Sequence, residues 1–344
     1  MAIPPIRTAA RLGLCAVVAT VWQLVPLSAQ ANPSHELLVP ENHPTVQAAV
    51  DAAQPGDRIR VQPGVYREQV VIDKNVSITG AGTRKTTILA PQTLVAGEDG
   101  GTSIVEIHGG ASVALSQLAV SGPGSGTCSD GALGSGIRVL GGARLDLGHA
   151  RVTHITDTPA APCAHSAVAV FAGDFPVGTG SVTIHESEIS DYQGSAVTVL
   201  NQGSSATIVN STVTGHPRLS TDGIGFIAGA AGRVTGNTIS GNDCREPDPA
   251  CGPDFFGETQ HVGVAAGTNT VVEHNRLIGN HVGIYAVGGS DSIGHNDITR
   301  SSYFGMALQD GSFTVSYTHR QCRHTGAARR GAHPANVGGA GTHL

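Results

Sequence analysis

The chain has 344 residues and a formal net charge of −6, and it is rich in glycine (47 residues) and poor in aromatic side chains (4%). With one tryptophan and few other aromatic residues, a nucleic-acid surface built on base stacking is disfavoured, and the negative charge repels nucleic acids and anionic membranes. The glycines follow no strict three-residue period, so they indicate frequent turns rather than collagen.

The first 31 residues have the pattern of a secretory signal peptide. Two arginines precede an almost wholly apolar run at residues 12–27, and residues 29–31 (Ala-Gln-Ala) form a small-residue cleavage site. A membrane anchor, the alternative, needs about 20 apolar residues, whereas Gln23 and Pro26 interrupt this run. We therefore expect a secreted, extracellular monomer with no nucleic-acid or membrane partner.

A short amphipathic helix is predicted at residues 45–53, early in the mature chain. Val46, Ala49, Val50 and Ala53 have the i, i+3, i+4, i+7 spacing of one helix face, and a Gln-Pro-Gly sequence follows. We expect residues 32–56 to be an N-terminal cap, which covers a strand edge that would otherwise expose unpaired backbone groups.

One phrase recurs through the body of the chain: a Gly or Ala, an apolar residue, any residue, and usually a second apolar residue. Its lead apolar residues recur at intervals of 20 to 40 positions: Ile137, Val168, Val197, Ile224, Val264, Ile284 and Met306. Short strands of this kind cannot bury a face within one repeat, but stacked repeats share a continuous core. Two-sheet sandwiches also use short strands, but they do not predict this recurrence. The sequence predicts an all-β fold, a single-stranded right-handed parallel β-helix over residues 57–315.

Each repeat contains a second short strand with an apolar residue at its centre. In several repeats an asparagine lies two or three residues before that apolar residue: Asn210, Asn237, Asn275 and Asn296. Asparagine tolerates left-handed backbone and bonds to its own chain. We expect these residues in tight turns between strands, where their amides would stack as a ladder.

Four cysteines lie outside the leader and the C-terminal tail, which is the even number expected of two disulfides in an oxidising compartment. The predicted pairs are Cys128–Cys163 and Cys244–Cys251. Zinc is the alternative, although none of the four forms a CxxC pair.

Residues 316–344 contain arginine, histidine and glycine but no acidic residue, and we expect a disordered basic tail. Because the leader and this tail hold six arginines, residues 32–315 carry 14 basic and 26 acidic residues. An anionic polysaccharide would therefore need local positive groups or a bridging cation to bind there.

Four phrases near the start of the body resemble the opening of the pectin methylesterase and pectate lyase-like β-helix superfamily. They are Thr45 to Ala53, Pro55-Gly56-Asp57-Arg58, Pro63-Gly64-Val65-Tyr66 and Ser77-Ile78-Thr79-Gly80. The resemblance covers roughly residues 43–120. It implies the right-handed β-helix and an acidic or plant-type polysaccharide as substrate, but it does not specify an activity.

The same resemblance disfavours pectin methylesterase activity. The esterases carry a glutamine phrase and two aspartates on the exposed face of the first sheet, but Ser135-Gly136-Ile137-Arg138 lacks the glutamine. Ala169 and Thr198 stand where the aspartates are expected, and the similar phrase that begins at Asp254 lies several repeats too late.

Period-two alternation predicts which side chains of the recurring strand point outward. The predicted outward row consists mostly of small residues: Arg138, Ala169, Thr198, Gly225, Ala265, Tyr285 and Ala307. Insertions precede this strand at residues 122–134, 157–165, 215–222 and 243–260, so they should form a wall along one edge of the row.

His261 and His281 each stand two residues before the phrase in adjacent repeats, about 4.8 Å apart if the strands pair. Asp222 precedes its own phrase by one residue, and Tyr285 lies nearby. Histidine and tyrosine exchange protons near neutral pH, so we predict that His261, His281, Tyr285 and Asp222 catalyse a lyase-like β-elimination. The alternative for each histidine is a solvated or turn-bonding side chain.

Tyr303 and Arg138 are the predicted substrate-binding residues, and Asp222 with Asp254 would bind calcium as a cofactor. Arg138 has a structural alternative, since Glu106 occupies the outward slot one repeat earlier and could pair with it. The alternative for the whole protein is a non-catalytic glycan-binding or structural extracellular β-helix.

Overall fold

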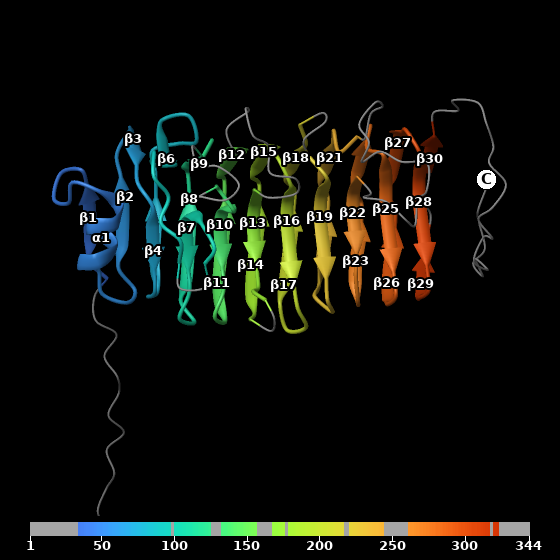
Figure 1. Cartoon of the computed structure of the whole chain (residues 1–344), viewed down its shortest axis with the longest axis horizontal. Helices are drawn as coiled ribbons and strands as arrows, with labels where there is room; N and C mark the ends of the chain where they lie inside the picture. The colour runs from blue at the N-terminus through green and yellow to red at the C-terminus, as the bar shows by residue number, and fades with distance from the viewer. Residues whose placement is uncertain are drawn as a thin grey trace, which may run out of the picture. The chain divides into compact units, whose positions relative to one another are not determined.

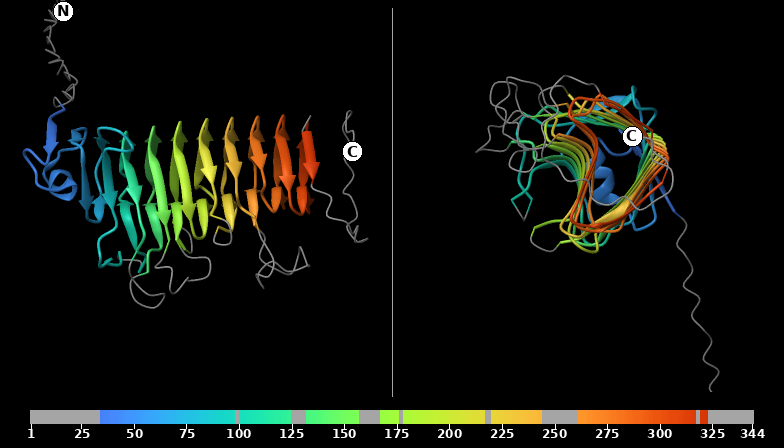
Figure 2. Two further views of the ribbon diagram at one scale, coloured as in Figure 1. Left: turned by 90° about the horizontal axis from the view of Figure 1, so that it is seen from above. Right: turned by 90° about the vertical axis from the view of Figure 1, so that its right-hand side faces the viewer.

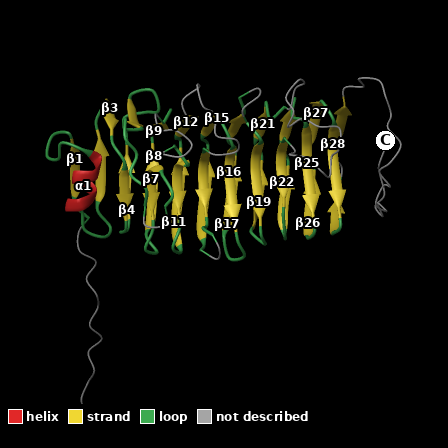
Figure 3. Ribbon diagram, in the orientation of Figure 1, coloured by secondary structure: helices red, strands yellow, loops and turns green. Residues whose placement is uncertain are grey.

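The structure is a computed structural model that describes residues 34–97, 100–124, 132–156, 167–175, 178–216, 220–243, 261–316 and 319–322. The predicted signal peptide, both predicted disulfides (Cys128–Cys163 and Cys244–Cys251) and Asp254 lie outside these residues. Within the described part the chain forms one helix and three sheets of parallel strands (Figures 1 and 3).

Sheet A contains, in spatial order, β1 (Glu36–Val39), β2 (Arg58–Val61), β5 (Val76–Thr79), β8 (Ser112–Ser116), β11 (Ala143–Gly148), β14 (Gly180–His185), β17 (Ser205–Val209), β20 (Ala231–Thr235), β23 (Thr270–Glu273), β26 (Ser290–Gly294) and β29 (Ser312–Val315). Sheet B contains β3 (Gly64–Arg67), β6 (Thr86–Leu89), β9 (Ala119–Ser121), β12 (Arg151–Ile155), β15 (Glu188–Tyr192), β18 (Thr212–Thr214), β21 (Thr238–Ser240), β24 (Arg276–Ile278), β27 (Asp297–Ser301) and β30 (His319–Cys322). Sheet C contains β4 (Val70–Ile72), β7 (Ser103–Ile107), β10 (Ser135–Val139), β13 (Val168–Ala172), β16 (Ser195–Leu200), β19 (Asp222–Ile227), β22 (Val262–Ala266), β25 (Val282–Val287) and β28 (Phe304–Gln309).

The chain runs from a strand of sheet A to one of sheet B, then to one of sheet C, and then to the next strand of sheet A. We call one such circuit a rung, and the two connections that matter below the A–B turn and the B–C turn. Each strand pairs in parallel with the rungs before and after it, and the sheets surround a common interior (Figure 2). This is the right-handed parallel β-helix that the repeat predicts.

The recurring phrase lies on sheet C, where its lead apolar residues are buried in the interior. They are Ile137, Val170, Val197, Ile224, Val264 and Ile284, with the half-buried Met306 packed against the same core. Sheet B adds a second buried row: Val152, Ile189, Val213, Ile239, Leu277 and Ile298. Burying one such side chain contributes about 1.5–3 kcal/mol, so the stacked rows form the core.

One copy of the phrase has a different register from the prediction. Val170, not Val168, pairs with Ile137 and Val197. Phe171 therefore takes the outward slot beside Arg138, and the prediction of Ala169 for that slot was wrong. The sequence Ala-Val-Ala-Val fits the period of two in both frames, so alternation alone could not fix the register.

The glycine of the phrase allows the next rung to approach closely. A Cβ atom on Gly263 would lie 2.7 Å from the carbonyl oxygen of Gly283, and one on Gly283 would lie 2.4 Å from that of Gly305. Because both distances are shorter than a real Cβ contact, a side chain at either position would push the rungs apart.

A buried amide ladder stabilises the A–B turns. Asn237 Nδ2 donates to Asn275 Oδ1, and Asn275 Nδ2 donates to Asn296 Oδ1, each at 3.0 Å. The ladder prediction is confirmed for these three residues but was wrong for Asn210, which lies one position earlier with φ 49°. Ser211 takes that place, and its backbone N–H donates to Asn237 Oδ1 at 2.9 Å.

The N-terminal helix α1 (Val46–Ala52) is confirmed, and it buries Val46, Ala49 and Val50. Thr45 Oγ1 accepts the backbone N–H of Ala48, and the Glu68 carboxylate accepts those of Val46 and Gln47. The helix thus contacts the first rung through both its apolar face and its N-terminus.

The longest connections between strands all run from sheet B to sheet C, at residues 90–102, 122–134, 156–167 and 241–261. The prediction that insertions collect at one corner is therefore confirmed. At the other end of the molecule, β30 pairs with β27, so strand pairing extends beyond residue 315. In the described part of the chain, no helix has the length and apolar character needed to cross a bilayer.

Candidate functional site

The predicted histidines lie at the B–C turns, immediately before strands of sheet C. The backbone N–H of Val282 donates to the carbonyl of His261, and that of Tyr303 donates to the carbonyl of His281. His261, His281 and Tyr303 therefore occupy one position in three successive rungs, as the sequence predicted for the two histidines. His261 is buried, whereas His281 is only partly covered.

His281 is held by a relay of two polar side chains. Its Nδ1 lies 3.1 Å from Ser302 Oγ, and Ser302 Oγ donates to Asp243 Oδ1 at 2.6 Å. Because the only hydroxyl hydrogen of Ser302 goes to Asp243, His281 must supply the hydrogen of the first bond from Nδ1. This network assigns the unprotonated nitrogen of the neutral ring to Nε2.

Desolvation lowers the pKa of His281, and the nearby Asp243 carboxylate opposes this shift without reversing it. The imidazole is therefore mostly neutral at neutral pH. A neutral ring with its lone pair on Nε2 can accept a proton, which is the requirement for a general base.

Aromatic rings flank His281 on the next rung. The Tyr303 ring stacks parallel to the imidazole, with ring centroids 5.2 Å apart and an interplanar angle of 7°. Phe304 lies against Tyr303 with a centroid distance of 4.2 Å. Tyr303 is 39% exposed, so a flat surface adjoins the candidate base.

Asp222 occupies the first position of β19 and pairs with Val262, which pairs in turn with Val282. It therefore lies two rungs from the start of the strand that follows His281, roughly 10 Å away at the usual strand spacing. Burial raises the pKa of its carboxyl to about 7, and the backbone N–H of Val262 offsets part of that shift. Asp222 thus retains a proton near neutrality.

Two other predicted site residues, Tyr285 and Arg138, do not lie beside His281. The Tyr285 hydroxyl donates to Gln309 Oε1 at 2.7 Å, toward the far end of the strand from His281. Arg138 is five rungs away, buried, and paired with Asp174 at 3.1 Å. Glu106 lies opposite Arg138 in strand register, one rung earlier, in the outward slot predicted for it.

The described neighbours of Asp222 along its column of sheet C offer few oxygen ligands for calcium. Calcium takes six to eight oxygen ligands. In the column of sheet C that contains Asp222, Ser195 precedes it and Val262, Val282 and Phe304 follow it. Val262, Val282 and Phe304 belong to an apolar cluster on this face. Asp254, the second predicted ligand, lies outside the described residues, so the calcium prediction stays a prediction.

Sequence reasoning missed Asp243 and Ser302, the two residues that orient His281. Asp243 is separated from Ser302 by 59 positions, and the contact depends on where a long connection leaves sheet B. Ser302 could have been found, because it immediately precedes Tyr303 in the turn that follows His281 by one rung.

A cavity with a volume of about 360 Å³ lies away from His281, beside the first strands of sheet A. Its lining includes Glu36, Arg60 and Pro63. It contains none of the residues that surround His281, so it is not part of the candidate site.

Comparisons with known proteins agree with the fold. A family model described as a right-handed β-helix region matches residues 177–339. The enzymatically active domain of tailspike protein 2 from bacteriophage CBA120 is similar, with a TM-score of 0.53 and 13% identity over 80% of this chain. An alginate lyase from Paenibacillus sp. str. FPU-7 has a TM-score of 0.48 and 11% identity over 83% of this chain and 99% of its own.

The chain spans 40% of the tailspike domain to which it is similar. A comparison with curated proteins gave no match. At these identities, the structural similarity establishes the fold alone. The parallel sheets, the family model and the similarity to the tailspike domain together show that the chain is a right-handed parallel β-helix protein.

Proposed function

We propose that the protein cleaves an acidic polysaccharide by β-elimination at the start of sheet C, with His281 as the base. The observation that carries this proposal is the relay from Asp243 through Ser302 to His281, which leaves Nε2 unprotonated. The lowered pKa of His281 keeps the ring neutral. The similar tailspike domain is enzymatically active, which supports catalysis on this fold.

In this reaction, His281 Nε2 takes the proton from the carbon next to the uronate carboxylate. The electron pair forms a carbon–carbon double bond, and the bond to the neighbouring sugar oxygen breaks. The departing oxygen takes a proton from water, because Asp222 lies two rungs, roughly 10 Å, from the start of the strand that follows His281.

Substrate contacts would come from residues beside the base. The exposed ring of Tyr303 offers an apolar face for a sugar. Arg300 is exposed near the end of β27, two residues before Ser302, and is our candidate cation for a uronate carboxylate. We further propose export of the protein after cleavage of residues 1–31, which N-terminal sequencing of the secreted product would test.

The proposal predicts that His281→Gln lowers turnover by about 10²–10⁴-fold, because that is the usual contribution of a general base. The assay follows the absorbance of unsaturated products from pectate, alginate and glycosaminoglycans, with and without calcium. His154→Gln is the matched control, since His154 is an exposed histidine on β12 of sheet B. Equal turnover in the wild type and His281→Gln would contradict the assignment.

A second candidate function is glycan binding without cleavage. It is favoured by the outward row next to the site, where Gly225, Ala265 and Ala307 offer no acid or base. Glycan binding that survives His281→Gln, with no unsaturated product from the wild type, would support it.

A further inference from the structure

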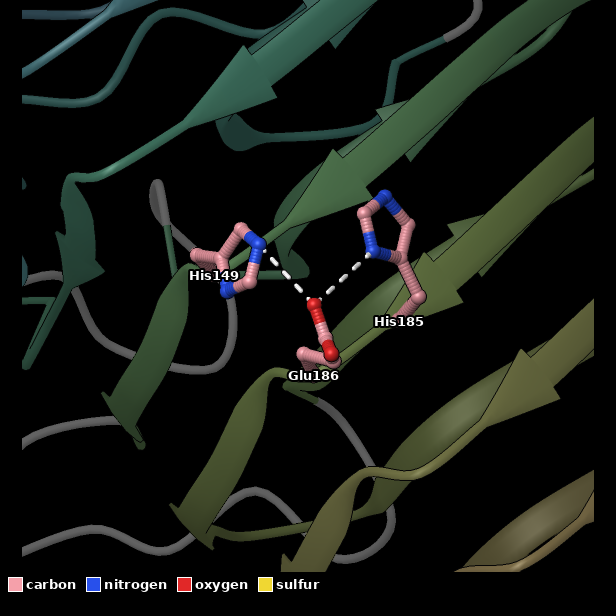
Figure 4. Close-up of side chains that lie close together, drawn as sticks. All are labelled: His149, His185 and Glu186. Carbon is pink, nitrogen blue, oxygen red and sulfur yellow. Dashed lines mark ion pairs between the residues drawn. The ribbon is translucent and has the colours of Figure 1, made fainter.

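A second cluster of titratable side chains lies on a different corner of the molecule, at the A–B turn between the rungs of β11 and β14. His149 follows β11, and His185 and Glu186 occupy the end of β14 and the residue after it. Gly148 pairs with His185, so His149 and Glu186 hold the same position in adjacent rungs. Figure 4 shows both imidazoles directed at the Glu186 carboxylate.

The backbone explains why these side chains converge. His149 and Glu186 have φ values of 49° and 50°, which is the left-handed conformation at equivalent turns. The backbone N–H of His149 also donates to the carbonyl of His185 at 3.2 Å. Two rungs with the same turn geometry therefore project their side chains from the corner in the same direction.

The ligand atoms of the three residues lie within 4.8 Å of one another. His149 Nε2 is 2.9 Å from Glu186 Oε2, and His185 Nδ1 is 3.9 Å from the same oxygen. Around a tetrahedral zinc ion, with bonds of about 2.0–2.2 Å, ligand atoms are separated by roughly 3.4 Å. Small side-chain rotations would bring the three atoms to that separation.

His185 is already oriented as a metal ligand would be. Its Nε2 lies 3.1 Å from Asp146 Oδ1, on the previous rung. A carboxylate on one ring nitrogen fixes the tautomer and directs the lone pair of the other nitrogen toward the metal. The ring also packs over Gly148, where a Cβ atom would lie 2.4 Å from His185 Cε1.

We propose that His149, His185 and Glu186 bind a zinc ion that links two adjacent rungs, and that Asp146 positions His185. Two imidazoles and one carboxylate are a ligand set suited to zinc, with a fourth position open to water. They do not suit calcium, which takes six to eight oxygen ligands. Since Asp146 and Glu186 carry two negative charges, a divalent ion neutralises the cluster.

The experiment is a titration of the metal-free full chain with zinc chloride at neutral pH, by calorimetry and by thermal unfolding. We expect the wild type to bind one more zinc ion per chain than His149→Ala, and zinc to raise its midpoint of unfolding more than that of the variant. His154→Ala is the control, because His154 also has a left-handed backbone and lies 3.3 Å from Asp191 of the next rung. It should bind as the wild type does.

Histidines of the C-terminal tail remain in every variant, so their zinc binding cancels in the comparison. Glu186→Gln should also lose the site, and Asp146→Asn should weaken it roughly 10–100-fold, as removal of such a partner does. Equal stoichiometry and equal thermal shifts in the wild type, His149→Ala and Glu186→Gln would overturn the proposal, and so would a calcium-induced shift as large as that with zinc.

Discussion

Two residues of the candidate site have pKa values shifted in opposite directions by the same cause. Burial lowers the pKa of His281 and raises that of Asp222, because it disfavours the charged form of each. Near neutral pH the histidine is mostly uncharged and the carboxyl keeps part of its proton. In the proposed reaction, His281 is therefore neutral when it acts as the base.

The raised pKa of Asp222 also predicts a pH dependence of folding. Its carboxyl has a pKa of about 7 in the folded chain, above its usual value of 3.8, so its stabilising contribution is complete below about pH 4 and is lost as the pH rises through 7. The total loss is at most about 4 kcal/mol.

Asp222→Asn should remove this loss and be more stable than the wild type at about pH 8, because the amide stays neutral. Urea unfolding of both proteins across this pH range measures the difference. Asp310→Asn, which removes an exposed carboxylate, is the control. The same slope in the wild type and Asp222→Asn would show that Asp222 ionises normally.

The sequence predicted the positions of residues in strands and turns more accurately than the contacts that their side chains make. Stacking of His261, His281 and Tyr303 in successive rungs follows from strand register, which the repeat reveals. The contact of Tyr285 with Gln309 depends on which way a rotatable side chain leans, which the period of two does not specify. The equivalent positions of His149 and Glu186 could have been predicted from the second series of short strands, because each residue stands two positions before a strand of that series.

At the scale of single elements, the asparagine ladder links the A–B turns of three rungs. Asn275 occupies its middle: it accepts from Asn237 and donates to Asn296. The left-handed residues that precede the ladder, such as His274 at φ 56°, direct the chain around this corner. The ladder therefore satisfies buried polar groups that the tight turns would otherwise leave without partners.

Asn275→Ala should destabilise the protein by roughly 2–4 kcal/mol, because it leaves buried N–H groups of Asn237 without an acceptor. Asn210→Gly should change stability by less than about 0.5 kcal/mol, since Asn210 is exposed and glycine tolerates its positive φ. Denaturant unfolding of both variants tests this, and equal losses would mean that the ladder has no special role.

Asn210 and Val168 show the same limit of sequence reasoning. The ladder position that was predicted for Asn210 is held by the next residue, Ser211. The buried position that was predicted for Val168 is held by Val170, two residues later. The asparagine turn can place either of two neighbouring residues inward, and the run that contains Val168 alternates equally well in both frames. Packing against the adjacent rung decides between the frames, and that information is not local.

At the scale of the whole molecule, each rung contacts mainly its two neighbours, so stability should be distributed along the stack. The fold class and the capping helix could be predicted because both depend on periodicity. Helix α1 covers the interior at the first rung, and it does so through three buried side chains: Val46, Ala49 and Val50.

Val50→Asp should detach α1, because it places a charge at a position that is 1% exposed. We expect faster amide hydrogen exchange in β2 and β4, with protection in β22 and β25 unchanged. Ala52→Asp, on the exposed side of the same helix, is the control. Uniformly faster exchange along the chain would show that the rungs unfold as one unit.

The concentration of long connections at the B–C turns makes this corner a natural place for engineering. The A–B turn is fixed by its buried amides, whereas residues 241–261 already lengthen a B–C turn without breaking the pairing of β21 with β24. A foreign peptide grafted into one of these turns would be carried beside sheet C and leave the stack intact. New recognition loops could thus be exchanged on this scaffold while the rungs beneath them stay the same.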